Sequence, residues 1–227
     1  GTAHSAPGSF NVVAGGTVGD VTLTHTGTSL AAGARTVYAI EFTASATGAL
    51  ASAANSRIRL SMPAGTTYTG GVTSNVFVGG TDVGGCFSPN GLIIDCFLDT
   101  GASIAAGARV TVTLAGITNP DTPGPKRVAV NTTSDTEPID STPIEVVPAG
   151  DVGDVTFANT GPSPAAGART VYAVEFTTSP TGMLAYAANS RIRLTMPAGT
   201  TFAGGVTSNV FVGGTDVGGC FSPNGLI

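Results

Sequence analysis

The chain has 227 residues and a net charge of −5, and only 10% of its residues are charged, against about a quarter in an average globular protein. Its 41% hydrophobic content is enough for a packed core. An acidic chain with a single lysine has no basic patch to neutralise phosphates, which argues against nucleic acid as a partner. No apolar run approaches 18 residues, so we expect no membrane insertion in this segment.

A long internal repeat organises the sequence. Residues 18–93 return as residues 152–227, at an offset of 134, and only 13 of the 76 positions differ. A copy this long and this close indicates a duplicated domain rather than a short solenoid repeat. We therefore predict an N-terminal segment at 1–17, a first repeat at 18–148 and a second, truncated repeat at 149–227.

The N-terminal segment contains one predicted strand, formed by Phe10, Asn11, Val12 and Val13. At the repeat offset, this strand matches Ile144–Val147, which closes the first repeat. The segment at 10–13 therefore resembles the closing strand of a unit that is otherwise not in this chain. This makes it the candidate assembly strand.

The first repeat then reads as short strands separated by turn signals. In Thr36–Thr43, for example, Tyr38, Ile40 and Phe42 alternate with smaller or polar residues, which is the period-two pattern of a half-buried strand. We expect strands at Asp20–His25, Thr36–Thr43, Arg57–Met62, Val72–Val78, Leu92–Leu98, Arg109–Ile117, Arg127–Asn131 and Ile144–Val147.

The rest of the repeat is expected to be turns and loops. Gly79–Gly85 is predicted as a glycine-rich loop, and Ala31–Ala34 and Ala51–Asn55 could each form at most one turn of helix. Eight or nine strands without a convincing helix are typical of a two-sheet antiparallel sandwich. The predicted fold class is all-β, with tandem antiparallel immunoglobulin-like β-sandwiches of which the second copy is incomplete.

Two of the three cysteines flank a turn. Cys86 and Cys96 enclose Ser88–Gly91, whose Ser-Pro-Asn-Gly sequence favours a tight turn. A hairpin around this turn brings the two cysteines opposite each other, so we predict a disulfide with Cα atoms about 4.4–6.8 Å apart. Cys220 repeats Cys86, and its partner would fall at position 230. Cys220 is therefore expected to be unpaired by truncation.

Several phrases of the first repeat resemble a known family. RTVYAIEFTASATGAL at 35–50, RIRLSMPAGTT at 57–67 and RVTVTLAGITNPDTPGPKRVAVNTTSDTEPI at 109–139 are similar to tandem β-sandwich domains of large secreted surface proteins of bacteria and archaea. The chain departs from that pattern at Pro123–Lys126 and in its cysteine hairpin. The resemblance implies a β-sandwich and an extracellular, cell-surface location, whereas its motifs are structural rather than catalytic.

Catalytic residues are sparse, and we predict that the chain is not an enzyme. A nucleophilic site needs a base next to a Ser, Thr or Cys, and the two histidines, His4 and His25, read as ordinary surface residues. Glu41, repeated as Glu175, is the strongest carboxylate candidate for glycoside chemistry. The simpler interpretation is a surface ion pair between Glu41 and Arg57 or Arg59 on a neighbouring strand.

No cofactor is predicted, although calcium at the junction between repeats is left open. Asp151 and Asp154 lie at the junction, and Asp135, Glu137 and Asp140 lie in the preceding loop. Calcium prefers several oxygen ligands from flexible loops, but no DxDxDG loop is present.

Two functions remain open at this stage. The first is a structural repeat module of an extracellular stalk, sheath or filament, whose partners are further copies of itself, head to tail. The second is an adhesin or glycan-binding module that uses loops at one end of the sandwich, or binds another surface protein. Its aromatic candidates are Tyr38, Tyr68, Phe77 and Tyr186, and a row of exposed rings would favour it. The single lysine, Lys126, makes an isopeptide staple unexpected, and Asn131–Thr133 is a glycosylation sequon.

The second repeat stops at Leu226–Ile227, inside a predicted strand. Counterparts of Arg109–Ile117, Arg127–Asn131 and Ile144–Val147 are therefore missing, which would leave unpaired sheet edges. In one hypothesis, Phe10–Val13 of another chain completes the open unit by strand exchange. In the other, the sequence is a window from a longer repeat array. Both hypotheses predict an elongated head-to-tail polymer.

Overall fold

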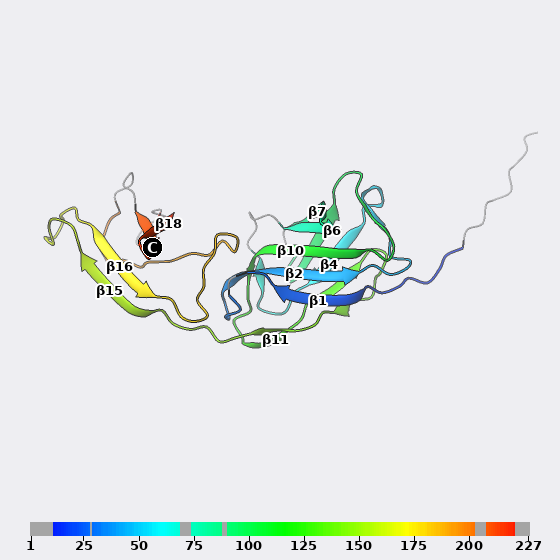
Figure 1. Cartoon of the computed structure of the whole chain (residues 1–227), viewed down its shortest axis with the longest axis horizontal. Helices are drawn as coiled ribbons and strands as arrows, with labels where there is room; N and C mark the ends of the chain where they lie inside the picture. Colours follow the sequence, from blue (N-terminus) through cyan, green and yellow to red (C-terminus); the bar gives the residue numbers. More distant parts are fainter. Residues whose placement is uncertain (1–10, 28, 69–73, 88–89, 203–207, 221–227) are drawn as a thin grey trace, which may run out of the picture. The chain divides into compact units, whose positions relative to one another are not determined.

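The computed structural model describes residues 11–27, 29–68, 74–87, 90–202 and 208–220. The chain separates into two compact units, Gly1–Ser190 and Arg191–Ile227, and each is described here by itself. Figure 1 traces the strands in chain order. Within the described ranges, no helix is long and apolar enough to cross a membrane.

The regular secondary structure of the described residues is almost entirely strand, and the predicted all-β antiparallel sandwich is confirmed. Seven of the predicted strands appear within one to two residues of their expected bounds. In the first repeat the strands are β1 (Gly19–His25), β2 (Arg35–Thr43), β3 (Leu50–Ala51), β4 (Arg57–Ser61), β5 (Thr67–Tyr68), β6 (Asn75–Val78), β7 (Thr81–Cys86), β8 (Ile93–Leu98), β9 (Ser103–Ile104), β10 (Arg109–Thr118), β11 (Gly124–Lys126), β12 (Ala129–Thr132), β13 (Ile139–Asp140) and β14 (Ile144–Val146).

One continuous sheet forms most of the first repeat, where two separate sheets were expected. Its strand order is β1-β2-β10-β6-β7-β8-β4-β12-β13, with β5 also pairing with β10. β1, β2 and β10 lie side by side in the centre of Figure 1. Just beyond β13, the backbone N–H of Thr142 donates to the carbonyl of Val21 in β1, at 3.1 Å. This bond links the two ends of the sheet, so the sheet folds over on itself and nearly closes.

β7 is the longest of the strands that the sequence pattern missed, the others being the two- and three-residue strands β3, β5, β9, β11 and β13. Gly79–Gly85 was predicted as a loop, but only Gly79 and Gly80 form the turn, with φ angles of 57° and 81°. β7 follows at once and pairs with β6 on one side and β8 on the other. A Cβ on Gly84 would lie 2.1 Å from the carbonyl oxygen of Phe97, so glycine is needed here for close strand approach. The loop prediction is therefore wrong for residues 81–85.

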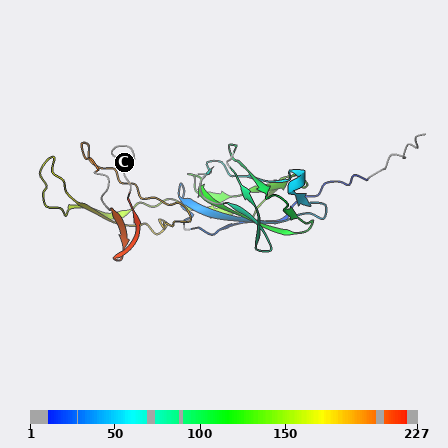
Figure 2. The same cartoon turned by 90° about the horizontal axis from the view of Figure 1, so that it is seen from above.

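The short helical turn at Ala51–Asn55 is present as a 3₁₀ helix, η1 (Ser52–Ala54), drawn as the cyan coil in Figure 2. Asn55 ends it in the left-handed region, with φ of 52°, a conformation that asparagine tolerates better than most residues. The stretch 31–34 forms no helix. Ala31 instead makes a parallel bridge to Val147, the last residue of the closing segment.

Alternating residues of the strands build the core of the first repeat, as the period-two pattern predicts. Its largest fully buried side chains are Tyr38, Ile40, Phe42, Ile58, Leu60, Val76, Ile94, Ile104, Val110, Val112, Leu114 and Ile117. Burying one such aliphatic side chain contributes about 1.5–3 kcal/mol, so this core supplies most of the driving force for folding.

Tyr38 is the core aromatic residue with a polar group, and its buried hydroxyl has a hydrogen-bond partner. Its hydroxyl donates to Oδ1 of Asn119 at 2.5 Å, while Nδ2 of Asn119 donates to the carbonyls of Ser29 and Ala31. Burial raises the pKa of the Tyr38 hydroxyl well above its ordinary value. This network ties the loop before β2 to the end of β10.

The second repeat keeps the hairpins of the first but not its sandwich. β15 (Gly153–Asn159) pairs with β16 (Tyr172–Thr177) in the register of β1 and β2, shifted by 134 residues. β17 (Asn209–Val212) pairs with β18 (Thr215–Gly219), as β6 does with β7. Residues 191–195, which correspond to β4, form no strand in this described part of the chain. A strand there would need neighbours equivalent to β8 and β12.

Candidate interaction face

A disulfide joins Cys86 on β7 to Cys96 on β8, with the Cα atoms 3.9 Å apart. This is closer than the expected range. Because the N–H of Phe87 donates to the carbonyl of Asp95, the neighbouring Cys86–Cys96 pair is a non-hydrogen-bonded pair, the closer of the two kinds in an antiparallel ladder. The disulfide therefore pins β7 and β8 in one register next to the turn between them.

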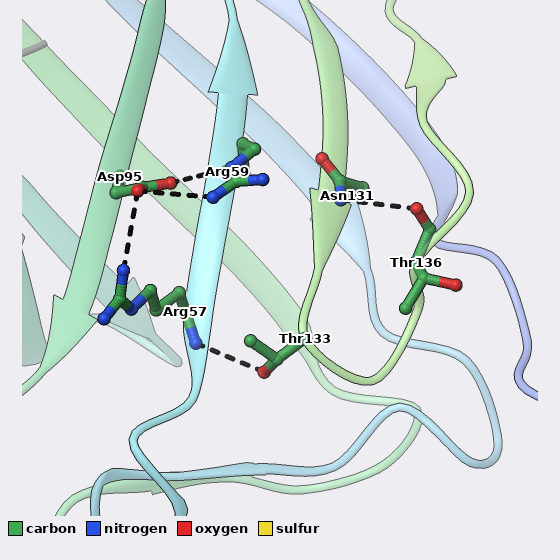
Figure 3. Close-up of polar contacts among 6 residues, drawn as sticks. All are labelled: Arg57, Arg59, Asp95, Asn131, Thr133 and Thr136. Carbon is green, nitrogen blue, oxygen red and sulfur yellow. Dashed lines mark hydrogen bonds and ion pairs between the residues drawn. The ribbon is translucent and has the colours of Figure 1, made fainter. Parts of the chain in front are cut away.

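The same strand, β8, carries polar side chains on its outward face. Asp95 lies opposite Arg59 on β4, and Arg59 lies opposite Asn131 on β12, so the three form one cross-strand row. Nε of Arg59 donates to Oδ1 of Asp95 at 2.9 Å (Figure 3). Asn131 turns the other way and donates to the carbonyl of Thr136 at 3.3 Å.

The next row along the same strands is aromatic and basic. Phe97 lies opposite Arg57, whose carbonyl accepts from the N–H of Thr133 and whose N–H donates to the Thr133 hydroxyl (Figure 3). The guanidinium carbon of Arg57 lies 4.7 Å from the centre of the Phe97 ring, which is cation–π geometry. The Phe97 ring in turn packs against Phe87, with ring centres 5.7 Å apart. We call Arg57, Arg59, Asp95, Phe87 and Phe97 the arginine face.

The two arginines of the arginine face interact unequally with Asp95. Asp95 accepts from Arg59, while the nearest nitrogen of Arg57 lies 3.8 Å away, too far for a hydrogen bond. The hydrogen bond to Asp95 and then its negative charge raise the pKa of Arg59. The side chains of Arg57 and Arg59 are 38% and 46% exposed, and that of Asp95 is 26% exposed. The carboxylate of Asp95 thus lies near two guanidinium groups, both of which are partly exposed to solvent.

Glu41 has a different partner from the one expected. It lies on β2, whose neighbours are β1 and β10, so it pairs with Arg109 on β10 at 2.5 Å. Arg57 and Arg59 lie on β4, which is not adjacent to β2. The predicted pairing of Glu41 with these arginines is therefore wrong, although a surface cross-strand ion pair does form. Such a pair contributes about 0–1 kcal/mol.

The two histidines form no catalytic arrangement in the part of the chain that the structure describes. His4 lies outside that part. Burial lowers the pKa of His25, while a hydrogen bond with the backbone of Ser29 acts in the opposite direction. Its buried Nε2 has no hydrogen-bond partner among the described residues. Among the described residues, Nε2 of His25 therefore has no acid or nucleophile within hydrogen-bond distance.

The acidic residues near the junction have separate roles. Asp135 is fully buried, and its carboxylate accepts from the backbone N–H and the hydroxyl of Ser45. Asp154 accepts from the hydroxyl of Thr177, and Asp151 and Glu137 are exposed. No group of three or more His, Cys, Asp or Glu among the described residues is placed to hold a metal ion. The prediction of no cofactor, with calcium at the junction left open, is therefore not tested by this arrangement.

The aromatic residues considered for sugar stacking differ widely in their exposure to solvent. Tyr38 is buried, Tyr68 and Phe77 are half-buried, and Tyr186 is 99% exposed in the second repeat. In the first repeat, the exposed ring is instead Phe87, at 62%. Sequence reasoning missed it because Phe87 directly follows Cys86 and reads as part of the hairpin. The pairing of β7 with β8 is what places it beside Phe97.

The predicted assembly strand is not a strand in Asn11–Val13, and Phe10 lies outside the described residues. Val12 and Val13 are 85% and 66% exposed. The matching segment of the first repeat, β14, pairs with β11, whereas no described strand pairs with Asn11–Val13. A strand needs a partner for its backbone groups, and pairing of residues 10–13 with another chain remains a prediction.

No protein-family model matches the sequence, and no curated protein matches it. Among solved structures, the chain is similar to BslA, a bacterial hydrophobin, at 15% identity and a TM-score of 0.40, with 61% of this chain and 100% of BslA covered. It is similar to BcpA, the major pilin subunit of Bacillus cereus, at 11% identity and a TM-score of 0.34, with 73% of this chain and 53% of BcpA covered. It is also similar to the 35 kDa C-terminal fragment of a major pilin of Streptococcus agalactiae, at 8% identity and a TM-score of 0.34, with 67% and 61% covered. The chain thus spans less than two thirds of either pilin chain, and likenesses this distant transfer no activity or partner.

Proposed function

We propose that the chain is a structural repeat module of an extracellular fibre or stalk, in which β-sandwich repeats follow one another head to tail. The observation that carries this proposal is the connection between the two copies. Val147 is held to its own repeat by bonds with Leu30 and Ala32, at 3.0 and 2.8 Å, and β15 of the next copy begins at Gly153. Only residues 148–152 lie between them.

A connection this short limits how far one repeat can move from the next. Five residues span at most about 18 Å when fully extended, which is less than the length of a sandwich of this size. The disulfide supports an extracellular location, because disulfides persist in oxidising compartments and are rare in the cytosol. Further copies of the same module are the partners that this arrangement suggests.

The test is to make chains with two, three and four complete copies of residues 18–151 and to measure their maximum dimension by small-angle X-ray scattering. An array of spacers predicts a dimension that grows linearly with copy number. A dimension that levels off as copies are added would contradict the proposal, because it would mean that the repeats collapse onto one another. Circular dichroism of each chain shows that every added copy is folded.

A further inference from the structure

The arginine face has features that a spacer does not need. Four of its side chains come from the adjacent strands β8 and β4, in the interior of the sheet order, and Phe87 directly follows β7, with its N–H donating to the carbonyl of Asp95. Their backbone groups are therefore already paired, and the face presents side chains rather than a free edge. A partner that meets it cannot add a strand to the sheet and must be recognised by side-chain contacts.

The guanidinium group of Arg57 has N–H donors that are available for a further hydrogen-bond acceptor. A guanidinium has five N–H donors, and no described side chain accepts a hydrogen bond from that of Arg57. Arg57 is nonetheless held in place, because its guanidinium lies over the Phe97 ring. A positioned guanidinium with free donors is suited to bidentate contact with a carboxylate.

The charge of the face favours an anion. Two guanidinium groups share Asp95, which leaves one positive charge in excess on a chain whose net charge is −5. On the same side of the sheet, Asp140 lies opposite Ala129, and the exposed Asp99 follows Phe97 by two residues, so the excess positive charge is local to the two guanidinium groups. By contrast, the exposed Arg109 pairs with Glu41, whose other oxygen accepts from the Thr111 hydroxyl, and no second arginine of the described residues pairs with this carboxylate.

An exposed aromatic ring lies next to these donors. Phe87 is 62% exposed and packs against Phe97 with the ring planes at 60°, so the two rings form an apolar surface beside Arg57. Aromatic rings and arginine together are the side chains most enriched where proteins bind partners tightly. A flat ring also offers a surface on which the C–H face of a sugar can stack.

We propose that the arginine face binds a polysaccharide that carries carboxylate groups, such as a uronate polymer. The sugar ring stacks on Phe87, and its carboxylate accepts two hydrogen bonds from Arg57, with Arg59 adding charge. This site lies on the sheet face rather than on the loops at one end of the sandwich. It does not depend on the structural role proposed above, because a single folded repeat contains all five residues.

The binding test uses the 227-residue chain in affinity electrophoresis with polygalacturonate as the probe. Dextran serves as the neutral saccharide and poly-glutamate as the acidic peptide, at about 0.05 and 0.15 M salt. We expect polygalacturonate to retard the chain, more strongly at the lower salt concentration, and dextran and poly-glutamate to leave it unaffected. No retardation by polygalacturonate would overturn the proposal, and equal retardation by poly-glutamate would replace it with an acidic-peptide site.

Four variants locate the site. Arg57→Gln and Phe87→Ser should each weaken binding about fivefold or more, since each removes one of the two contact types. Asp95→Asn should strengthen it, because it removes the carboxylate that competes with the ligand. Arg109→Gln is the matched control, an exposed arginine on another part of the sheet, and should leave binding unchanged. Equal weakening by Arg109→Gln would show attraction to charge in general, and weaker binding by Asp95→Asn would contradict the proposed competition between Asp95 and the ligand. Thermal unfolding of each variant confirms that it is folded.

Discussion

The two repeats have nearly the same sequence and very different burial. Tyr38 is fully buried, whereas its counterpart Tyr172 is 42% exposed, and Ile58 is fully buried, whereas Ile192 is 37% exposed. The hairpin β15–β16 nevertheless keeps the register of β1–β2. Hairpins are thus specified by residues close in sequence, while the sandwich needs partners that come from far along the chain.

The strands that cover the first repeat can be named. β2 is flanked by β10 in the first repeat, and β4 by β8 and β12. Among the described residues of the second copy, β16 pairs with β15 alone and residues 191–195 form no strand. The apolar side chains there are therefore not covered by a second layer of strands. Hydrophobic burial, rather than turn chemistry, therefore decides which copy forms a core.

The largest expected difference between the copies comes from a matched pair of core substitutions. Ile58→Ala should destabilise the first repeat by about 2–5 kcal/mol, because it removes buried methylene groups and leaves a cavity. Ile192→Ala should change the main unfolding transition by less than about 0.5 kcal/mol, as surface substitutions usually do. Urea unfolding followed by far-UV circular dichroism measures both.

The unchanged chain and the double variant complete this comparison. If the two sites are independent, the double variant should lose as much stability as Ile58→Ala alone. Equal losses from the two single variants would mean that the second repeat forms the same core as the first, and would contradict the contrast described here.

The disulfide should give the next largest effect. Replacing Cys86 and Cys96 by Ser opens a loop with a sequence separation of 10 residues, and chain-entropy arguments give a loss of about 2–3 kcal/mol. The same unfolding experiment measures it. Cys220→Ser should have no effect on stability, because Cys220 has no disulfide.

Reduction of the unchanged chain provides the control for this prediction. A reducing agent should lower its stability to that of the Cys86→Ser, Cys96→Ser variant and should leave the variant unaffected. A reduced chain that keeps its full stability would show that the paired strands, and not the covalent link, hold the hairpin together.

The sequence predicted the strands with clear alternation and missed those without it. β2, β4 and β10 alternate apolar and polar residues, and they appear close to the predicted bounds. β7 contains Gly84 and Gly85, so it has no alternating pattern, although it lies between two other strands. The glycines are explained by the close approach of β8, which a single sequence does not reveal.

The candidate site was harder to predict for a related reason. Arg57, Arg59 and Asp95 lie on strands that could be predicted, but their pairing depends on the order of those strands in the sheet. Period-two patterns give the face on which a residue lies and not its neighbour across the ladder. This is why Glu41 was assigned the wrong arginines, and why the contact between Phe87 and Phe97 was not foreseen.

The smallest expected effect concerns the one early-strand position where the copies differ in charge. The first repeat has His25, and the second has Asn159. Desolvation lowers the pKa of His25 below 6.5, so in the window between the folded and the unfolded pKa the unfolded chain binds more protons. Stability therefore rises with pH through this window and is lost as pH falls below about 6.5.

The substitution His25→Asn, which copies the second repeat, should remove this dependence. Unfolding free energies measured from about pH 8 down to about pH 5 should fall more steeply for the unchanged chain than for the variant. Carboxylates that titrate at the lower end of this range are the same in both chains, so they cancel in the difference. If the two curves run parallel from one end of the range to the other, His25 keeps its ordinary pKa in the folded state. The early strand of the first repeat would then be as open to water as its copy.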